Sequence, residues 1–113
     1  MESHYIINPK SYYSYTNGTS LQGYIKTTYA QLVETLGEPI RPEGGDGKVI
    51  CEWVVLNKKT NKAATIYIYK LNEVPENEYP WHIGGLNNTA IATVKKLFPS
   101  QECKSAYWTS ETP

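Results

Sequence analysis

The side chains best suited to chemistry are two histidines, His4 and His82, and two cysteines, Cys51 and Cys103. They do not occur at spacings such as Cys-x-x-Cys or His-x-x-x-His, by which metal sites are recognised. A serine nucleophile needs a nearby base, and His82 is the one candidate base in the middle of the chain. The sequence also contains no nucleophile elbow. The sequence therefore predicts no enzyme, no metal centre and no cofactor.

Two ionisable residues have both a functional and a structural interpretation. His82, between Trp81 and Ile83, could contact a phosphate or a base edge, but a lone histidine beside aromatic residues is more often structural. Glu52 lies among apolar residues and is either an acid with a perturbed pKa or a residue that faces solvent from a one-sided strand.

Two glycine-bearing segments, Gly18–Tyr24 and Trp81–Gly85, are candidates for ligand contact. Glycine lets the backbone approach a ligand closely, and Thr19, Ser20 and Gln22 add neutral donors suited to phosphate oxygens. The alternative is that both segments are simple turns, since neither matches a phosphate-binding loop or a dinucleotide fingerprint.

Aromatic residues are abundant, with ten tyrosines and three tryptophans in 113 residues. Tyr67, Tyr69, Trp53 and Trp81 could present flat faces on which nucleobases stack. Core packing is the competing explanation, and we expect Trp53 to be buried. Lysine and arginine side chains at four positions could converge on an anion, although solvated surface is their usual place: Lys26, Arg41, Lys48 and Lys70.

Charge and hydropathy limit the classes of partner. Eleven basic and eleven acidic residues cancel, so we expect no binding to duplex nucleic acid or to an anionic membrane. The sequence contains no secretory signal and no run long enough to span a membrane, which predicts a cytoplasmic protein with reduced cysteines.

The pattern of apolar residues predicts an α+β fold in one domain over 1–113, with an ordered core of about 17–98 and a C-terminal tail over 99–113. Thr28 and Gln31 resemble a capping box, which begins a helix that Gly37 ends. The other expected elements are a short strand over 4–8, loops over 18–24, 41–47 and 71–80, a hairpin of strands over 48–56 and 63–70, a strand over 81–83, and a helix from Asn87 or Asn88 to Phe98. Together they form an antiparallel sheet of three to four strands with two helices packed beside it.

An ordered set of motifs resembles a widespread family of small phage proteins. It runs from Gly18-Thr19-Ser20-Leu21-Gln22-Gly23-Tyr24, through Thr28-Tyr29, Leu36-Gly37-Glu38-Pro39, Glu52-Trp53 and Ala64-Thr65-Ile66-Tyr67, to Trp81-His82-Ile83-Gly84-Gly85. The motifs span about four fifths of the domain, and the family is similar to the anti-CBASS sponge proteins. The chain departs from the pattern that we expect of relatives at two places. It has Ile68-Tyr69 where we expect an acidic residue followed by an aromatic one, and it has Pro80 where we expect an acidic residue before the tryptophan.

The resemblance implies a phage protein that sequesters a cyclic dinucleotide signal of bacterial CBASS defence, such as 3',3'-cyclic GMP-AMP, without cleaving it. It also implies a homo-oligomer, with a tetramer favoured, in the cytoplasm of the infected host. With the residue patterns above, the expected ligand-binding residues are Thr19, Ser20, Gln22, Tyr24, Tyr67, Tyr69, Lys70, Trp81, His82 and Gly84. The alternative is an inhibitor that binds a host defence protein directly, as anti-CRISPR proteins do, because tyrosine and tryptophan also dominate protein interfaces.

Overall fold

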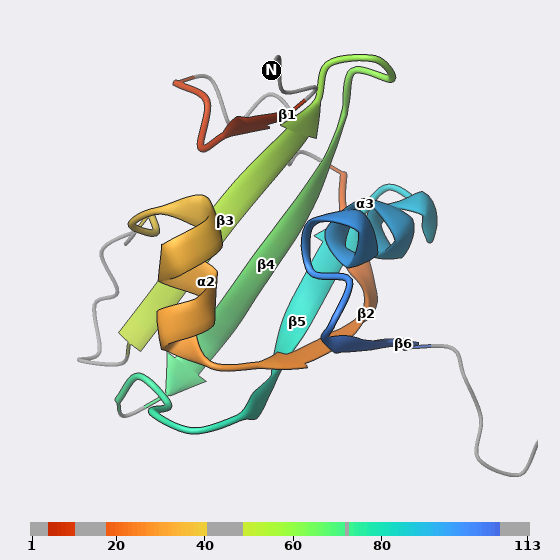
Figure 1. Cartoon of the computed structure of the whole chain (residues 1–113). Coiled ribbons are helices and arrows are strands. Elements are labelled where there is room, and N and C mark those ends of the chain that lie inside the picture. The colour runs from red at the N-terminus through yellow and green to blue at the C-terminus, as the bar shows by residue number, and fades with distance from the viewer. Residues whose placement is uncertain (1–4, 11–17, 41–48, 72, 107–113) are drawn as a thin grey trace, which may run out of the picture.

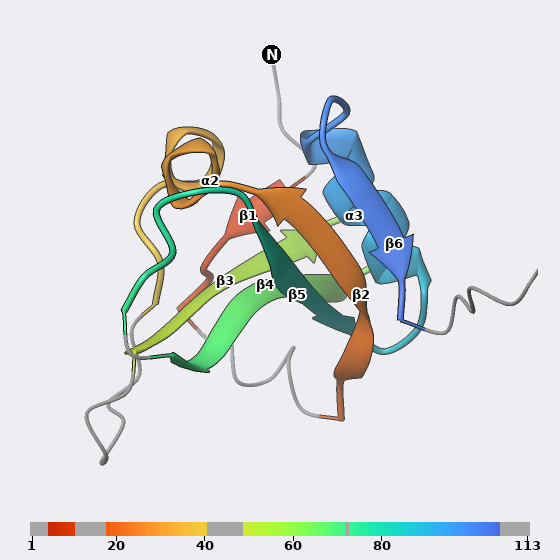
Figure 2. The same cartoon turned by 90° about the horizontal axis from the view of Figure 1, so that it is seen from below.

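Two helices cover one face of an antiparallel sheet in this computed structural model, which describes residues 5–10, 18–40, 49–71 and 73–106 (Figure 1). The helices are α2 (Tyr29–Leu36) and α3 (Thr89–Leu97), and the strands are β1 (Tyr5–Ile7), β2 (Ser20–Thr27), β3 (Val49–Asn57), β4 (Lys62–Leu71), β5 (Tyr79–Gly85) and β6 (Glu102–Ser105). The sheet order is β1-β3-β4-β5-β2-β6. Seen from below, both helices lie on the same side of the sheet (Figure 2). We call the other face, on which no helix of the described residues lies, the helix-free face.

The capping box predicted for the first helix is present. The Thr28 hydroxyl accepts a hydrogen bond from the Gln31 backbone N–H at 3.1 Å, and the Thr28 N–H donates to the Gln31 side-chain oxygen at 3.3 Å. The helix ends at Gly37, whose φ of 85° favours glycine. These local contacts explain why α2 begins and ends where the sequence predicts.

The predicted hairpin is also confirmed, because β3 and β4 pair antiparallel from Asn57 and Lys62 outward. Asn57 closes the turn by accepting from the N–H groups of Lys59 and Thr60. The expected loop over 41–47 lies outside the described residues.

The sheet has six strands, so the prediction of three to four strands was wrong. Residues 18–24, expected to be a polar loop, lie largely in β2, where the register shifts between Leu21 and Gly23. This bulge inserts Gln22 and breaks the alternation of period two by which a strand is recognised in a sequence. β5 likewise continues through both Gly84 and Gly85, where the sequence predicted a break.

Residues 102–105 form β6, although the sequence placed them in a polar tail. This strand pairs with β2, and its side chains alternate between exposed and partly buried positions. A strand of four polar or small residues at the edge of a sheet lacks the apolar pattern that predicts strands.

The core lies between the sheet and the two helices. Trp53, Trp81, Ile25 and the other inward strand residues are fully buried, and the helices contribute Leu32, Leu36, Ala90 and Val94. Gly85 allows α3 to approach closely, because a Cβ at this position would lie 2.5 Å from the Cβ of Ala90. The inward side chains of the sheet are therefore buried beneath the two helices.

Candidate functional site

Five polar or aromatic side chains form a row across five neighbouring strands on the helix-free face. The register pairs Glu52 with Tyr67, Tyr67 with His82, His82 with Tyr24, and Tyr24 with Lys104. Each of the four central strands alternates these residues with buried core residues such as Trp53, Ile66, Trp81 and Ile25. We call the set Glu52, Tyr67, His82, Tyr24 and Lys104 the cross-strand row.

Three aromatic rings stand together at the centre of the cross-strand row. The His82 ring centroid lies 5.1 Å from that of Tyr67, with an angle of 39° between the ring planes. On the other side it lies 5.4 Å from that of Tyr24, at an angle of 50°. All three side chains are partly buried, so the rings support one another and still present surface to a partner.

Gly84 makes room for this arrangement. A Cβ built on Gly84 would lie 2.5 Å from the Thr65 hydroxyl oxygen and 3.3 Å from Cε1 of Tyr67. Thr65 is 3% exposed, so its hydroxyl has little freedom to move. The absence of a side chain at residue 84 therefore positions Tyr67 beside His82.

Burial favours the neutral form of His82. Desolvation lowers the pKa of its imidazole below the usual 6.5, because the charged form loses hydration. Its Nδ1 is buried and has no hydrogen-bond partner among the described residues. A neutral imidazole can both donate and accept a hydrogen bond, which suits the recognition of a polar ring edge.

The pKa values of two further members of the row, Glu52 and Tyr67, are shifted toward the neutral forms of these groups. Burial raises the pKa of the Glu52 carboxyl above 4.5. Burial also raises the pKa of the Tyr67 hydroxyl, with smaller contributions from Glu52 and Tyr24. The centre of the row is therefore a weakly charged aromatic surface.

A shallow pocket of about 190 Å³ continues the row toward the edge of the sheet, and its walls are Tyr24, Lys26, Pro80, Glu102 and Lys104. Lys104 lies 3.3 Å from Glu102, and Lys26 lies 3.9 Å from Glu78. Both pairs are more than half exposed, so each contributes at most about 1 kcal/mol. The two ammonium groups can therefore change partners at little cost if an anion enters the pocket.

The predicted site residues at the start of β2 do not belong to the cross-strand row. Gln22 is 5% exposed, and its side-chain amide donates to the Gly85 carbonyl at 3.0 Å and to the Ser20 hydroxyl at 3.2 Å. Gln22 therefore holds the bulge against β5. Thr19 is partly buried and Ser20 is exposed, just before and at the first residue of β2.

Of the remaining predicted residues, Trp81 lies in the core. Its side chain is fully buried on the helix-bearing side and meets Trp53 edge to face, so it does not share a surface with His82. The side chains of Tyr69 and Lys70 lie outside the described part of the structure, as do Arg41 and Lys48. The structure thus gathers Tyr24, Tyr67, His82 and Gly84 from the predicted set.

The row also contains residues that the sequence did not assign to the site. Lys104 was missed because β6 was not predicted. Glu52 was interpreted as an acid with a perturbed pKa or as a residue that faces solvent, and neither interpretation gave it a binding role. Within residues 5–10, 18–40, 49–71 and 73–106, no group of three histidine, cysteine or acidic residues could hold a metal ion. In the same residues no helix is long and apolar enough to cross a membrane.

Comparisons with protein-family models, with curated proteins and with solved structures found no match to this chain.

Proposed function

We propose that this chain is a binding protein that sequesters a cyclic dinucleotide on the cross-strand row without cleaving it. The observation that carries the proposal is the group of three adjoining rings, Tyr24, His82 and Tyr67. Aromatic side chains in such a position stack with nucleobases, and each stacked base contributes about 1–3 kcal/mol. The neighbouring pocket adds two exposed lysines, Lys26 and Lys104, for one phosphate, and we place the second phosphate beside the His82 ring.

The proposed absence of catalysis follows from the chemistry of the row. Cleavage of a phosphodiester needs an activated nucleophile or a metal, and a base within reach of it. His82 and Glu52 are the candidate bases of the row, and the neighbours of His82 are two tyrosine rings in place of a residue that would orient it. Binding and retention of an intact nucleotide is the activity that these residues support.

The biological setting rests on the resemblance to anti-CBASS sponge proteins. It places the chain in the cytoplasm of an infected bacterium, where 3',3'-cyclic GMP-AMP is a signal to be captured. It also favours a tetramer, in which a second copy would cover the open face of the sheet and enclose the ligand. Light scattering coupled to size-exclusion chromatography measures this assembly directly.

The first experiment is a thermal-shift panel of cyclic dinucleotides, followed by recovery of the nucleotide from heat-denatured protein. A ligand present at a hundredfold over its Kd should add about 2.7 kcal/mol of stability. We expect a large shift and release of the intact nucleotide. Release of a linear product would contradict sequestration and indicate an enzyme.

Two variants locate the site. Tyr24→Ala and Tyr67→Ala each remove one stacking face and should weaken binding about tenfold or more, since a stacked base contributes about 1–3 kcal/mol. Tyr5→Ala is the matched control, because Tyr5 lies on β1 beside α3, away from the row. Equal affinity of all three variants and the unmodified chain would remove the row as the binding site.

A second function is favoured by the partial exposure of Tyr24, Tyr67 and His82. Partly exposed tyrosines on a sheet also suit contact with another protein. In this alternative the chain inhibits a host defence protein by covering its surface with the row. It would show no thermal shift with any nucleotide, and Tyr24→Ala would weaken the protein complex.

A further inference from the structure

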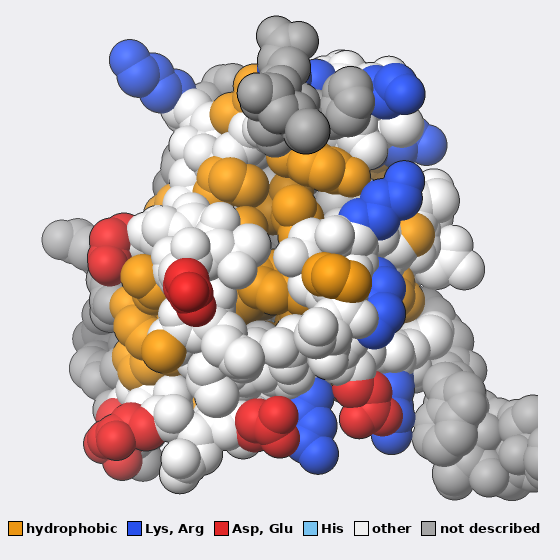
Figure 3. All heavy atoms as spheres, in the orientation of Figure 1, with side chains coloured by type: hydrophobic (Ala, Val, Ile, Leu, Met, Phe, Trp, Pro, Cys, Tyr) orange, Lys and Arg blue, Asp and Glu red, His pale blue; other side chains and the backbone are white. Residues whose placement is uncertain are grey.

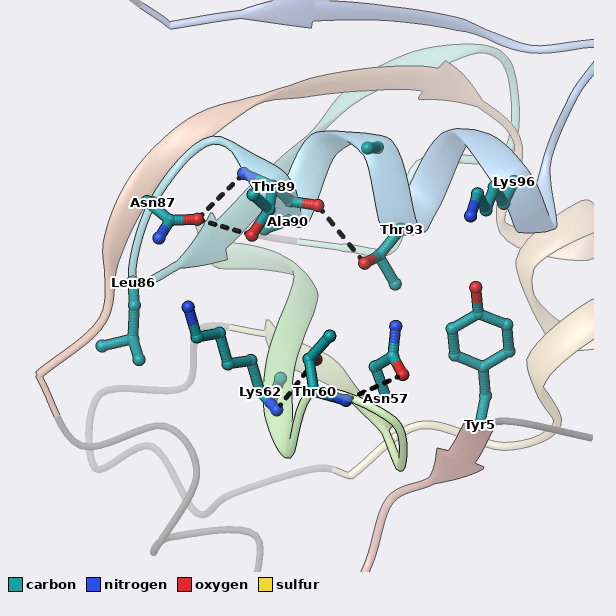
Figure 4. Close-up of a pocket in the computed structure, with 12 residues that line it drawn as sticks. Tyr5, Asn57, Thr60, Lys62, Leu86, Asn87, Thr89, Ala90, Thr93 and Lys96 are labelled. Carbon is teal, nitrogen blue, oxygen red and sulfur yellow. Dashed lines mark hydrogen bonds between the residues drawn. The ribbon is translucent and has the colours of Figure 1, made fainter.

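A second pocket lies on the other side of the sheet from the cross-strand row. It is bounded by α3, by the turn between β3 and β4 and by Tyr5 of β1, and it has a volume of about 230 Å³ (Figure 4). Its lining includes two lysines, Lys62 and Lys96, but none of its twelve lining residues is acidic. We call it the α3 pocket.

The polar groups of the α3 pocket are oriented toward its interior. Lys62 lies at one end and Lys96 at the other, where it faces the hydroxyl of Tyr5 (Figure 4). Between them, the Asn57 side-chain oxygen accepts from the N–H groups of Lys59 and Thr60. Its amide nitrogen, a donor, therefore points into the pocket (Figure 4).

The charges around the α3 pocket are unbalanced, although the whole chain is neutral. None of the ion pairs formed among the described residues includes Lys62 or Lys96. Lys58 and Lys59 are exposed on the adjoining turn. On the face that Figure 3 shows, several lysine side chains lie near α3, while the visible carboxylates lie along the lower edge and near α2.

The shape of the α3 pocket limits the size of its ligand. Pockets for drug-sized molecules usually have volumes of about 300–1,000 Å³, so this one suits a smaller molecule. Ala90 lines the pocket, and Leu86 is 54% exposed at its rim beside Lys62. This apolar edge can contact a carbon skeleton while the lysines bind anionic oxygens.

We propose that the α3 pocket binds a small organic phosphate, whose anionic oxygens reach both Lys62 and Lys96. The charge-assisted bonds from the two ammonium groups supply the attraction, and the Asn57 amide adds a neutral donor. This site is separate from the cross-strand row and does not depend on the function proposed for the row.

The experiment is an NMR titration of the ¹⁵N-labelled protein with inorganic pyrophosphate at constant ionic strength. We expect saturable shifts of the backbone amides of Asn57, Ala90 and Thr93. Lys62→Gln and Lys96→Gln should each weaken binding about tenfold, because hydrogen bonds to charged groups contribute roughly 1.5–3 kcal/mol. The spectrum of each variant shows whether it is folded, and either variant alone tests the site.

Two controls make the proposal falsifiable. Lys58→Gln removes the same charge from the same turn outside the pocket lining, and should change the affinity by less than about twofold, as expected of screened surface charges. Tyr24→Ala should leave pyrophosphate binding unchanged, which separates this site from the row. Shifts that rise linearly without saturation, or an equal loss in Lys58→Gln, would show diffuse charge attraction and overturn the proposal.

Discussion

The indole rings of Trp53 and Trp81 meet edge to face in the core, with ring centroids 5.6 Å apart. Both side chains are fully buried, yet their polar atoms differ. The Trp53 N–H donates to the Gly37 carbonyl at 2.8 Å. The Trp81 N–H has no partner among the described residues.

This difference predicts unequal costs for the same substitution. Trp53→Phe loses buried area and also leaves the Gly37 carbonyl without its donor, whereas Trp81→Phe removes an N–H that is buried and unpaired. We expect Trp53→Phe to lower the free energy of unfolding by about 1–2 kcal/mol more than Trp81→Phe does, from the cost of an unsatisfied polar group. Urea denaturation of the two variants measures the difference. A larger loss in Trp81→Phe would mean that its N–H has a partner.

Gly84→Ala is expected to disturb the cross-strand row. The new methyl group would lie 2.5 Å from the Thr65 hydroxyl oxygen and 3.3 Å from Tyr67, so these side chains must move. Overpacking of this kind costs about 1–3 kcal/mol, and displacement of Tyr67 should also weaken ligand binding. Thermal denaturation and a binding titration test both effects.

A compensating substitution gives the control for Gly84→Ala. Thr65→Ala removes the hydroxyl that lies nearest to the new methyl group, so the double variant should recover part of the lost stability. Additive losses in the double variant would show that the two sites are not in contact.

The sequence predicted the elements that depend on local contacts. The capping box of Thr28 and Gln31 forms within one turn of helix, and the β-branched and aromatic content of β3 predicts a strand. The expectation that this strand is one-sided was wrong, because Val54 and Leu56, on the same face as Glu52, are buried as well. β2 and β6 were missed because the first contains the Gln22 bulge and the second is short and polar. Both departures arise where tertiary pairing stabilises a segment whose own pattern does not indicate a strand.

The candidate site could be predicted only in part. Tyr24 and His82 are far apart in the chain, and only the pairing of β2 with β5 brings their rings together. Trp81 and His82 are adjacent, but neighbouring residues of a strand point to opposite faces. A motif that contains both therefore divides into a core residue and a surface residue, which the sequence alone did not separate.

Glu52→Gln is expected to change how stability depends on pH. Because burial raises the folded-state pKa of Glu52 above 4.5, the protein disfavours the carboxylate relative to the unfolded chain. The stability that its protonated form contributes is fully present below pH 4.5 and is lost as pH rises through the folded-state pKa. The variant has no charge to bury, so it should match the unmodified chain near pH 4 and be more stable at pH 8.

Urea denaturation at pH 4 and pH 8 measures this effect. Because the variant and the unmodified chain share all other titratable groups, the contributions of those groups cancel in the difference between the two free energies of unfolding. Glu102→Gln is the control, because Glu102 is exposed on β6. A difference between Glu52→Gln and the unmodified chain that stays constant with pH would show that Glu52 titrates normally.

Ligand binding on the cross-strand row should strengthen as the pH falls. The pKa of His82 in the free protein lies below 6.5 because of desolvation, and a phosphate beside the ring would raise it by favouring the charged form. The complex then takes up a proton that the free protein lacks, so affinity increases between pH 7.5 and pH 5.5, by at most about tenfold per pH unit for one proton. Cyclic dinucleotides do not titrate in this range, since their phosphodiesters remain ionised.

Calorimetric titration of 3',3'-cyclic GMP-AMP at these two pH values tests the prediction. His82→Gln should remove the pH dependence, whereas His4→Gln, which changes the other histidine of the sequence, should retain it. Glu52→Gln should retain it as well, which separates His82 from the other titrating group near Tyr67. Affinity that is independent of pH in the unmodified chain would mean that the phosphates lie away from His82 and that the ring contacts only a base.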